Sequence, residues 1–285
     1  SGIHADFIVA RGHEELDKPR REKLAFFCWL RSQDDVIAAP DVPSIYEIPL
    51  VLEKQRFANL LMKRLKVKPR KLMDGRWDDF VAKINKIKKS VKIAVVGKYF
   101  ATGDYTLADS YISVINAIKH AAWHSGVNAE LVWIDSEAYE KHAEKVKELG
   151  GYDALIVPGG FGTRGIEGII KAIQYARENN LPYLGLCYGM QLAAVEFARH
   201  VLGHKDAHTV ECDSKSKNLI INVNPNQAEN IKQGRYGGTM RLGAYDCVLS
   251  ANSLARRLYD ADKISERHRH RYEFNNKYLK PCEEA

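Results

Sequence analysis

Short apolar runs alternate with helix-like segments from residue 91 to about residue 201, and this alternation restricts the fold more than any other feature. Four runs are apolar almost throughout, as buried strands are: 92–97, 129–134, 152–157 and 182–186. The segments between and after them are typical of helices: 108–124, 137–149, 166–179 and 190–201. The pattern predicts an α/β fold with a doubly wound, mostly parallel sheet and helices on both faces. In such sheets the chemistry lies at the carboxyl ends of the strands.

The first 90 residues carry a shorter version of this pattern. The predicted elements are a strand at 7–10, a helix from Pro19 through Phe27, a turn at 41–46 and a helix near 49–52. Residues 1–60 are too few to close a core alone, so we expect them to be part of a larger α/β domain. Residues 61–90 are a basic connector with apolar residues at helical spacing, at Trp77, Val81, Ile84 and Ile87. The sequence thus predicts a partial domain, a linker with an amphipathic helix, and a domain at 91–285.

The composition excludes several classes of protein. The chain has 285 residues, 45% of them hydrophobic, which suits one large or two medium domains. No apolar run reaches the ~18 residues that a membrane span needs, and the first residues lack the pattern of a signal peptide. Without an initiating Met, we expect the chain to begin inside a longer cytoplasmic protein. The five cysteines are scattered and odd in number, which argues against a disulfide framework and a structural metal site.

The net charge of +7 is concentrated in the connector. Six Lys or Arg residues lie within 63–71 and five within 83–92, more than the whole net excess. A run of this kind is usually a solvated face or a linker. It lacks the interleaved aromatic residues on which bases would stack, so we expect no nucleic-acid partner.

The segment GLCYGMQ at 185–191 lies between a predicted strand and a predicted helix. A nucleophile on such a sharp turn needs small residues two before and two after it, because larger side chains would collide across the turn. Gly185 and Gly189 occupy these places around Cys187. The helix that begins here should direct its free N–H groups toward the sulfur and favour the thiolate. A buried structural cysteine in a tight turn is the alternative interpretation.

A second glycine-rich turn, PGGFG at 158–162, follows the preceding predicted strand. Glycines let the backbone approach a ligand and direct N–H groups toward it. The Gly160 and Tyr188 N–H groups could together form an oxyanion hole. Such a turn is weak evidence alone. The nearby sharp turn around Cys187, a nucleophile elbow, makes the assignment of an oxyanion hole persuasive.

A third cluster, at 266–272, alternates basic and imidazole side chains. It is either a charged surface strand with phosphate contacts, or a strand whose alternate side chains face a site, with an Arg gripping a carboxylate. A metal site at His268 and His270 is not expected, because the interleaved arginines would repel a cation. The same arginines should lower the basicity of both imidazoles.

Taken together, the elbow and the PGGFG turn resemble class I glutamine amidotransferases. Four further segments are similar to the CTP synthase family in particular: PRREK at 19–23, PDVPSIYEIP at 40–49, GGTMRLG at 237–243 and ERHRHRYE at 266–273. The resemblance covers essentially the whole chain.

This resemblance implies ATP-dependent amination of UTP to CTP, with ammonia from glutamine hydrolysis carried through an internal tunnel. It implies ATP and Mg²⁺ as cofactors, GTP as activator, CTP as inhibitor and a homotetramer. By motif position, Cys187 would be the nucleophile. The residues that would hold glutamine are Gly160, Tyr188, Gln191, Glu211 and Arg271. Lys23 matches a UTP or CTP contact, and an adenine would lie at Pro40, Asp41 and Val42.

Two parts of the family pattern are expected outside this chain. The phosphate-binding loop and Mg²⁺ ligands should precede residue 1, and the QFHPE-like segment with the catalytic His and Glu should follow Ala285. Two alternatives therefore stay open beside the synthase interpretation. One is another class I amidotransferase, against which residues 1–60 argue. The other is a truncated, non-catalytic module that binds glutamine or associates with full-length subunits.

Overall fold

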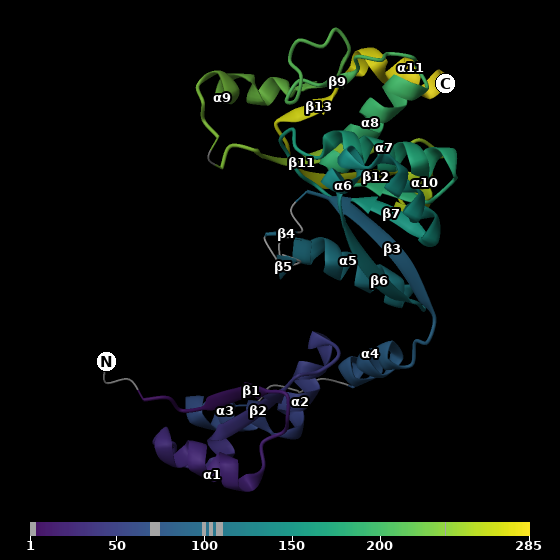
Figure 1. The fold of residues 1–285 in the computed structure, drawn as a ribbon. Helices are drawn as coiled ribbons and strands as arrows, with labels where there is room; N and C mark the ends of the chain where they lie inside the picture. Colours follow the sequence, from purple (N-terminus) through teal and green to yellow (C-terminus); the bar gives the residue numbers. More distant parts are fainter. Residues whose placement is uncertain (1–3, 69–74, 99–100, 103–104, 107–110, 237) are drawn as a thin grey trace. The chain divides into compact units, whose positions relative to one another are not determined.

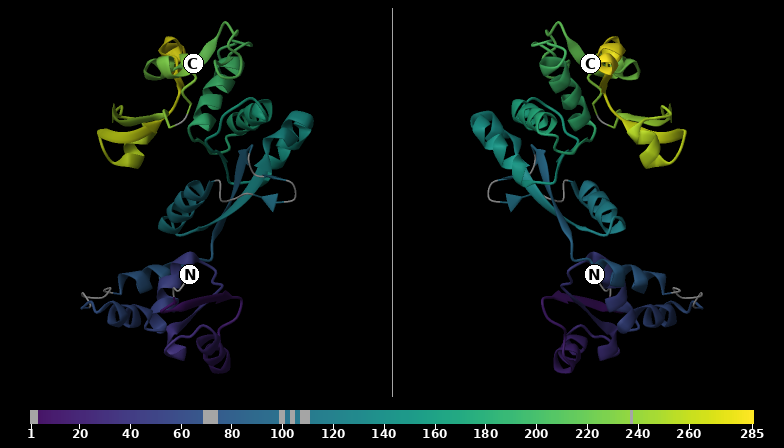
Figure 2. Two further views of the ribbon diagram at one scale, coloured as in Figure 1. Left: turned by 90° about the vertical axis from the view of Figure 1, so that its left-hand side faces the viewer. Right: turned by 90° about the vertical axis from the view of Figure 1, so that its right-hand side faces the viewer.

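The computed structural model describes residues 4–68, 75–98, 101–102, 105–106, 111–236 and 238–285. The chain forms two compact units, Ser1–Ile87 and Lys88–Ala285 (Figures 1 and 2). No helix in the described ranges combines the length and apolar content that crossing a bilayer requires.

The first unit is built on two parallel strands, β1 (Ile8–Gly12) and β2 (Val36–Pro40). The first four residues of β2 are buried, because helices cover the strand pair. These helices are α1 (Lys18–Phe27), α2 (Ile48–Lys54), α3 (Phe57–Leu65) and α4 (Arg76–Asn85), with 3-10 turns at Gln33–Asp35 and Ile45–Glu47. The predicted start of α1 is confirmed: Asp17 caps it, accepting from the Arg20 N–H, and a proline occupies its first turn.

Helix α4 is the amphipathic helix expected in the basic connector. Its buried residues are Val81 and Ile84, as the helical spacing predicts. The Trp77 indole N–H donates to the Tyr46 carbonyl over 2.9 Å, so this helix packs on the first unit. The boundary between the compact units follows Ile87. The division into a partial domain, a linker and a second domain stays a prediction.

The second unit contains a four-stranded parallel sheet with the order β6-β3-β7-β8. The strands lie close to the predicted places: β3 (Ser90–Gly97), β6 (Asn128–Asp135), β7 (Ala154–Val157) and β8 (Tyr183–Gly185). The chain moves from β3 outward to β6 and then crosses back past β3 to β7. With right-handed crossovers this reversal requires helices on both faces, so the predicted doubly wound α/β class is confirmed.

The helices of this unit are α5 (Ile112–His124), α6 (Ser136–Lys141), α7 (Ile166–Glu178) and α8 (Tyr188–His200). The expectation of one helix at 137–149 is wrong. The chain leaves the helical conformation at His142, with φ −135° and ψ 82°, and continues as a 3-10 segment, Ala143–Gly151. The break allows Tyr139 and Leu149 both to be fully buried. Residues 108–110 of the first predicted helix lie outside the described residues.

The rest of the unit adds smaller sheets beside the parallel one (Figure 1). Strand β10 (Leu219–Val223) is central in a three-stranded sheet with β9 (His208–Thr209) and β13 (Tyr272–Phe274). Strands β11 (Arg241–Val248) and β12 (Lys263–Arg269) form an antiparallel pair, and β4 (Ala101–Thr102) pairs with β5 (Tyr105–Thr106). The remaining elements are α9 (Ala228–Lys232), α10 (Leu254–Tyr259), α11 (Leu279–Glu284) and two 3-10 turns, Pro225–Gln227 and Asn276–Tyr278.

Candidate active site

Three chain segments that follow neighbouring strands meet at one edge of the parallel sheet. Lys98 comes directly after β3, the 158–162 turn after β7, and the elbow around Cys187 after β8. The strand order reverses between β3 and β7, and such a switch point is where open α/β sheets bind ligands. The fold therefore brings the two predicted turns to one place.

Cys187 has the backbone of a nucleophile elbow. Its φ of 52° and ψ of −101° are unusual for a residue with a side chain, and it lies at the N-terminal end of α8. A Cβ added at Gly185 would come within 2.6 Å of the Gly189 carbonyl carbon. A Cβ at Gly189 would come within 2.2 Å of the Val157 carbonyl oxygen. The predicted steric need for both glycines is confirmed.

The strain at Cys187 predicts a stability effect that is separate from chemistry. Cys187→Gly should raise the free energy of unfolding by about 1 kcal/mol relative to Cys187→Ala, because only glycine adopts this backbone without a Cβ clash. Both variants lack the thiol, so the pair isolates the backbone term. Urea unfolding followed by circular dichroism measures it, and equal midpoints for the two variants would show that the elbow is unstrained.

The 158–162 turn lies against the elbow. A Cβ at Gly159 would be 3.6 Å from the Cys187 Cβ, in ordinary contact. The Tyr111 hydroxyl donates to the Gly159 carbonyl over 3.1 Å. At the other end of the turn, the Gly162 N–H donates to the Glu211 carboxylate over 2.8 Å, and the Tyr188 hydroxyl donates to the Gly162 carbonyl over 2.7 Å. Gly160 lies between these fixed points.

Lys98 is the least expected member of the site. Its side chain is 95% buried, and its ammonium donates to the Gly162 carbonyl over 2.5 Å and to the Phe161 carbonyl over 3.2 Å. It also lies 3.4 Å from the Tyr188 hydroxyl and 4.5 Å from the centre of that ring. Burial lowers the pKa of Lys98 to about 8, against the opposing effects of Cys212 and Glu211.

The helix end acts on the Cys187 pKa in the expected direction, but the expected net preference for the thiolate is wrong. The residue as a whole is exposed, yet the protein around the sulfur desolvates it, and this raises the pKa of the Cys187 thiol. A hydrogen bond from the Tyr188 N–H lowers the pKa, and the Glu211 carboxylate raises it further. Desolvation and a nearby negative charge therefore outweigh the helix terminus.

The glutamine-binding residues expected from the resemblance lie around these turns. Gln191 is buried on α8, and its amide nitrogen donates to the Tyr272 carbonyl over 3.2 Å. The next residue toward the N-terminus, Arg271, donates to the Tyr236 carbonyl over 2.6 Å and lies over the ring of Tyr236. The Nη1 atom of Arg271 is buried without a hydrogen-bond partner in the described part of the chain. Hydrogen bonds thus join Tyr188 and Glu211 to the 158–162 turn, and Gln191 to the residue after Arg271, while Gly160 is placed by its neighbours in the turn.

In the third cluster, at 266–272, the pKa of one imidazole is shifted in the expected direction but by other causes. The pKa of His270 is lowered, as expected, but the causes are burial and then the neighbouring His268 rather than the arginines. His268 packs edge-on against Tyr245, 4.7 Å between ring centres. Across the described residues, no group of three or more His, Cys, Asp or Glu is arranged to hold a metal ion.

The expected nucleotide-binding residues lie in the first unit. Pro40 ends β2, and the Asp41 N–H donates to the Gly12 carbonyl over 2.9 Å, which places residues 40–42 beside the end of β1. The Asp41 carboxylate contacts Arg11 at 3.3 Å and His13 at 2.7 Å. Lys23 is exposed on α1. Within the described residues, no hydrogen bond or ion pair joins it to the other three.

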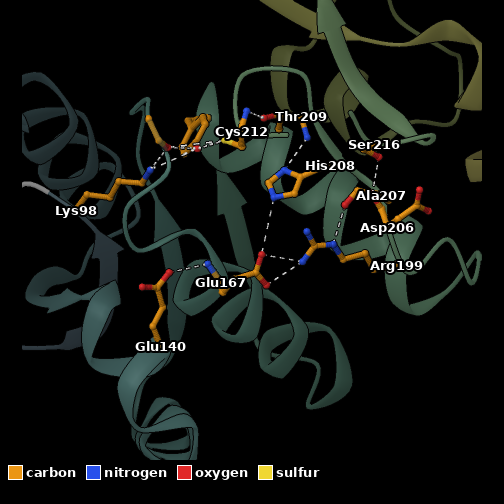
Figure 3. A network of polar contacts seen from close by, with 12 residues as sticks. Lys98, Glu140, Glu167, Arg199, Asp206, Ala207, His208, Thr209, Cys212 and Ser216 are labelled. Carbon is orange, nitrogen blue, oxygen red and sulfur yellow. Dashed lines mark hydrogen bonds and ion pairs between the residues drawn. The ribbon is translucent and has the colours of Figure 1, made fainter. Parts of the chain in front are cut away.

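Three residues at the site were not expected from the sequence: Lys98, Tyr111 and Cys212. The Cys212 sulfur is 3.5 Å from the Tyr188 hydroxyl, and Figure 3 shows Lys98 reaching toward it from the opposite side. Lys98 had a readable signal, because it follows an apolar strand directly at the end where chemistry is expected. Tyr111 and Cys212 had none, since only the folded chain brings them to the turn.

Comparison with known proteins assigns this architecture to a class. The sequence model for "Glutamine amidotransferase class-I" matches residues 106–284, and the one for "CTP synthase N-terminus" matches residues 1–67. The first match covers more than half of the chain, and the chain belongs to the class I glutamine amidotransferase family. The second match shows that residues 1–67 are similar to part of the N-terminal region of CTP synthases.

The individual relatives carry the same name. The chain is 44% identical to the CTP synthases of Thermococcus gammatolerans and Pyrococcus furiosus, over 284 residues in each case. The match covers 100% of this chain and 51% of each relative, so the chain spans about half their length. Among solved structures, it is similar to the glutaminase domain of Trypanosoma brucei CTPS with bound acivicin. That similarity has 35% identity and a TM-score of 0.59, and covers 68% of this chain and 72% of the other.

Proposed function

We propose that this chain carries the glutaminase nucleophile, Cys187, of a CTP synthase that aminates UTP with ammonia from glutamine. The single observation that supports this most is the strained elbow, with Cys187 at φ 52° between two glycines that no larger residue can replace. A structural cysteine would gain nothing from that conformation, whereas a nucleophile gains access to a substrate above the sheet edge.

In the proposed reaction the Cys187 sulfur attacks the side-chain carboxamide carbon of glutamine. The carbonyl electrons move to oxygen, and the Gly160 and Tyr188 N–H groups stabilise this oxyanion. When the intermediate collapses, the C–N bond breaks, the nitrogen takes a proton and leaves as ammonia, and a thioester remains. Water then hydrolyses the thioester to glutamate and restores the thiol. The raised pKa of Cys187 means that a base must assist the first step at neutral pH.

The charges around the elbow suit the two ends of a free amino acid. Glu211 lies beside the 158–162 turn and would attract the α-ammonium of glutamine. Arg271 has one buried guanidinium nitrogen that finds no partner among the described residues, and this nitrogen would donate to the α-carboxylate. Gln191, held by the Tyr272 carbonyl on the floor of the site, would contact the substrate amide.

The synthetase half of the reaction would involve the first unit in part. Lys23 would contact UTP or the inhibitor CTP, and residues 40–42 would lie against the adenine of ATP. Mg²⁺ is expected with the synthetase phosphates, and no described cluster of this chain fits a metal ion, so the proposal gives it no ligand here. Activation by GTP and assembly into a homotetramer are part of the same proposal.

The thiol assignment is tested by labelling. A chloroketone analogue of glutamine should modify Cys187 at least about 100-fold faster than any of the other four cysteines, because the proposed oxyanion donors, the Gly160 and Tyr188 N–H groups, belong to the turns at Cys187. Intact-mass measurement and peptide mapping give the rates, with Cys187→Ala as the control. Modification spread evenly over Cys28, Cys212, Cys247 and Cys282 would count against a glutamine site.

One observation favours a second candidate, a module that binds glutamine without turning it over. No histidine hydrogen-bonds the Cys187 sulfur in the described part of the chain, and a cysteine nucleophile ordinarily needs a nearby base. Rapid labelling by the analogue combined with glutamine binding and no ammonia release would favour this candidate for the chain as it stands.

A further inference from the structure

We propose that Lys98 is a positioning residue for the glutaminase reaction, which holds the 158–162 turn in place from beneath. This rests on the proposed function of Cys187. The Lys98 ammonium donates three hydrogen bonds, to the carbonyls of Phe161 and Gly162 and to the Tyr188 hydroxyl. In a peptide group the N–H points away from the C=O. A carbonyl that accepts a hydrogen bond from Lys98 therefore directs the N–H of the same peptide away from Lys98.

The contacts converge on a single peptide. The Gly162 carbonyl accepts from Lys98 over 2.5 Å and from the Tyr188 hydroxyl over 2.7 Å, while the Gly162 N–H is bound to Glu211. Tyr188 is also the residue directly after Cys187 and supplies the second expected oxyanion donor. Lys98 therefore touches both donor-bearing segments, the turn and the start of α8, and links their positions.

The charge of Lys98 is unusual for its place. Lys98 as a residue is 95% buried, and its ammonium donates to the uncharged oxygens of Phe161, Gly162 and Tyr188. Burying a cation in this way is costly unless its hydrogen bonds are made. Lys98 directly follows the carboxyl end of β3, and a leucine or methionine at this position would pack without the desolvation cost of a charge. Figure 3 shows Lys98 directed toward Cys212.

The groups around Lys98 make its hydrogen bonds to the turn sensitive to pH near 8. Burial lowers the pKa of Lys98 to about 8. The groups that face it are Cys212, Glu211 and Glu140, which favour the charged form, and Arg164, which opposes it. Because the folded value is depressed, the charge that strengthens the bonds to the turn is present below pH 8 and is lost as the pH rises through it.

The test compares two reagents on Cys187 of the full 285-residue chain. A chloroketone analogue of glutamine develops an oxyanion when the thiolate attacks, whereas iodoacetamide reacts by direct displacement and needs no such donor. Both rates share the same dependence on thiolate, so their ratio cancels the ionisation of Cys187 and reports the oxyanion donors. The ratio is measured by peptide mapping between pH 6.5 and 9.5.

Lys98→Met should lower this ratio by about tenfold or more, a fraction of the loss on removing a whole oxyanion donor. The iodoacetamide rate should change less than about twofold. In the unaltered chain the ratio should fall about threefold as the pH rises through 8, since a charged donor bonds more strongly than a neutral one. In Lys98→Met it should be independent of pH. Lys92→Met, which removes an exposed lysine at the other end of β3, is the matched control.

Three results would overturn the proposal: an unchanged ratio in Lys98→Met, an equal loss in Lys92→Met, or a ratio in the unaltered chain that does not change with pH. If Lys98→Met fails to fold, the pH profile of the unaltered chain decides alone. If the analogue shows no preference for Cys187 at all, the proposed function fails instead. Hydrogen exchange of residues 158–165 then decides the role of Lys98: about tenfold faster exchange in a folded Lys98→Met supports it, and equal exchange overturns it.

Discussion

Gly189→Ala should destabilise the second unit by about 2–4 kcal/mol and lower labelling of Cys187 by the glutamine analogue about 100-fold. An alanine inside a helix ordinarily gains about 1 kcal/mol over glycine. Here the new Cβ would come within 2.2 Å of the Val157 carbonyl oxygen and 2.9 Å of the Val157 Cβ. The first of these is backbone at the end of β7 and cannot move cheaply, so the collision outweighs the propensity gain and pushes α8 away from the sheet.

Two control glycines separate the elbow from general destabilisation. Gly168→Ala places a Cβ 1.8 Å from the Ser136 carbonyl, on α7 and away from the elbow, and should destabilise without changing the labelling of folded protein. Gly151→Ala meets nothing within 4 Å and should change neither. Chemical denaturation gives the free energies of unfolding, and peptide mapping gives the rates. If Gly189→Ala loses stability and keeps its labelling rate, the elbow is not the source of the reactivity.

The sequence predicted the parallel sheet because its strands are encoded locally. Each of β3, β6, β7 and β8 is a short, mostly apolar run within two residues of the expected place, and each is followed by a helix. Strand β10 reads LIINV, a run of the same kind, yet it pairs with β9 and β13 instead. Pairing partners depend on contacts between distant segments, which a local pattern does not contain.

The break at His142 and the pKa of Cys187 escaped prediction for a related reason. The apolar spacing of 137–149 is satisfied by a helix, whereas the turn at His142 goes with the full burial of both Tyr139 and Leu149 in the folded unit, which the local spacing does not contain. Likewise the helix end beside Cys187 was visible in the sequence. The desolvation around the sulfur and the Glu211 carboxylate, brought from 24 residues away, were not. The glycine spacing of the elbow was predictable because steric exclusion acts between near neighbours.

The chain of 285 residues should release ammonia as glutamine acylates Cys187, and should then turn over at a steady rate below about 10⁻³ per second. Enzymes of this kind usually turn over at about 1–10³ per second, and losing the base of a catalytic triad costs about 10⁴-fold or more. Three of the ten histidines have partners elsewhere in the described structure: His200 contacts Glu196, His208 contacts Glu167, and His204 packs against Tyr278. None hydrogen-bonds the Cys187 sulfur in that part of the chain.

The pH dependence of this slow reaction follows from the same site. The raised pKa of Cys187 leaves less thiolate at pH 7 than an ordinary thiol has, and without a base the acylation rate should rise about tenfold per pH unit through neutrality. Rapid-mix mass spectrometry of the thioester and coupled ammonia detection measure the two steps. A rate near 1 per second with a plateau around pH 7 would instead require a base within the chain. His270 would be the first to substitute, because its lowered pKa keeps it neutral and able to accept a proton.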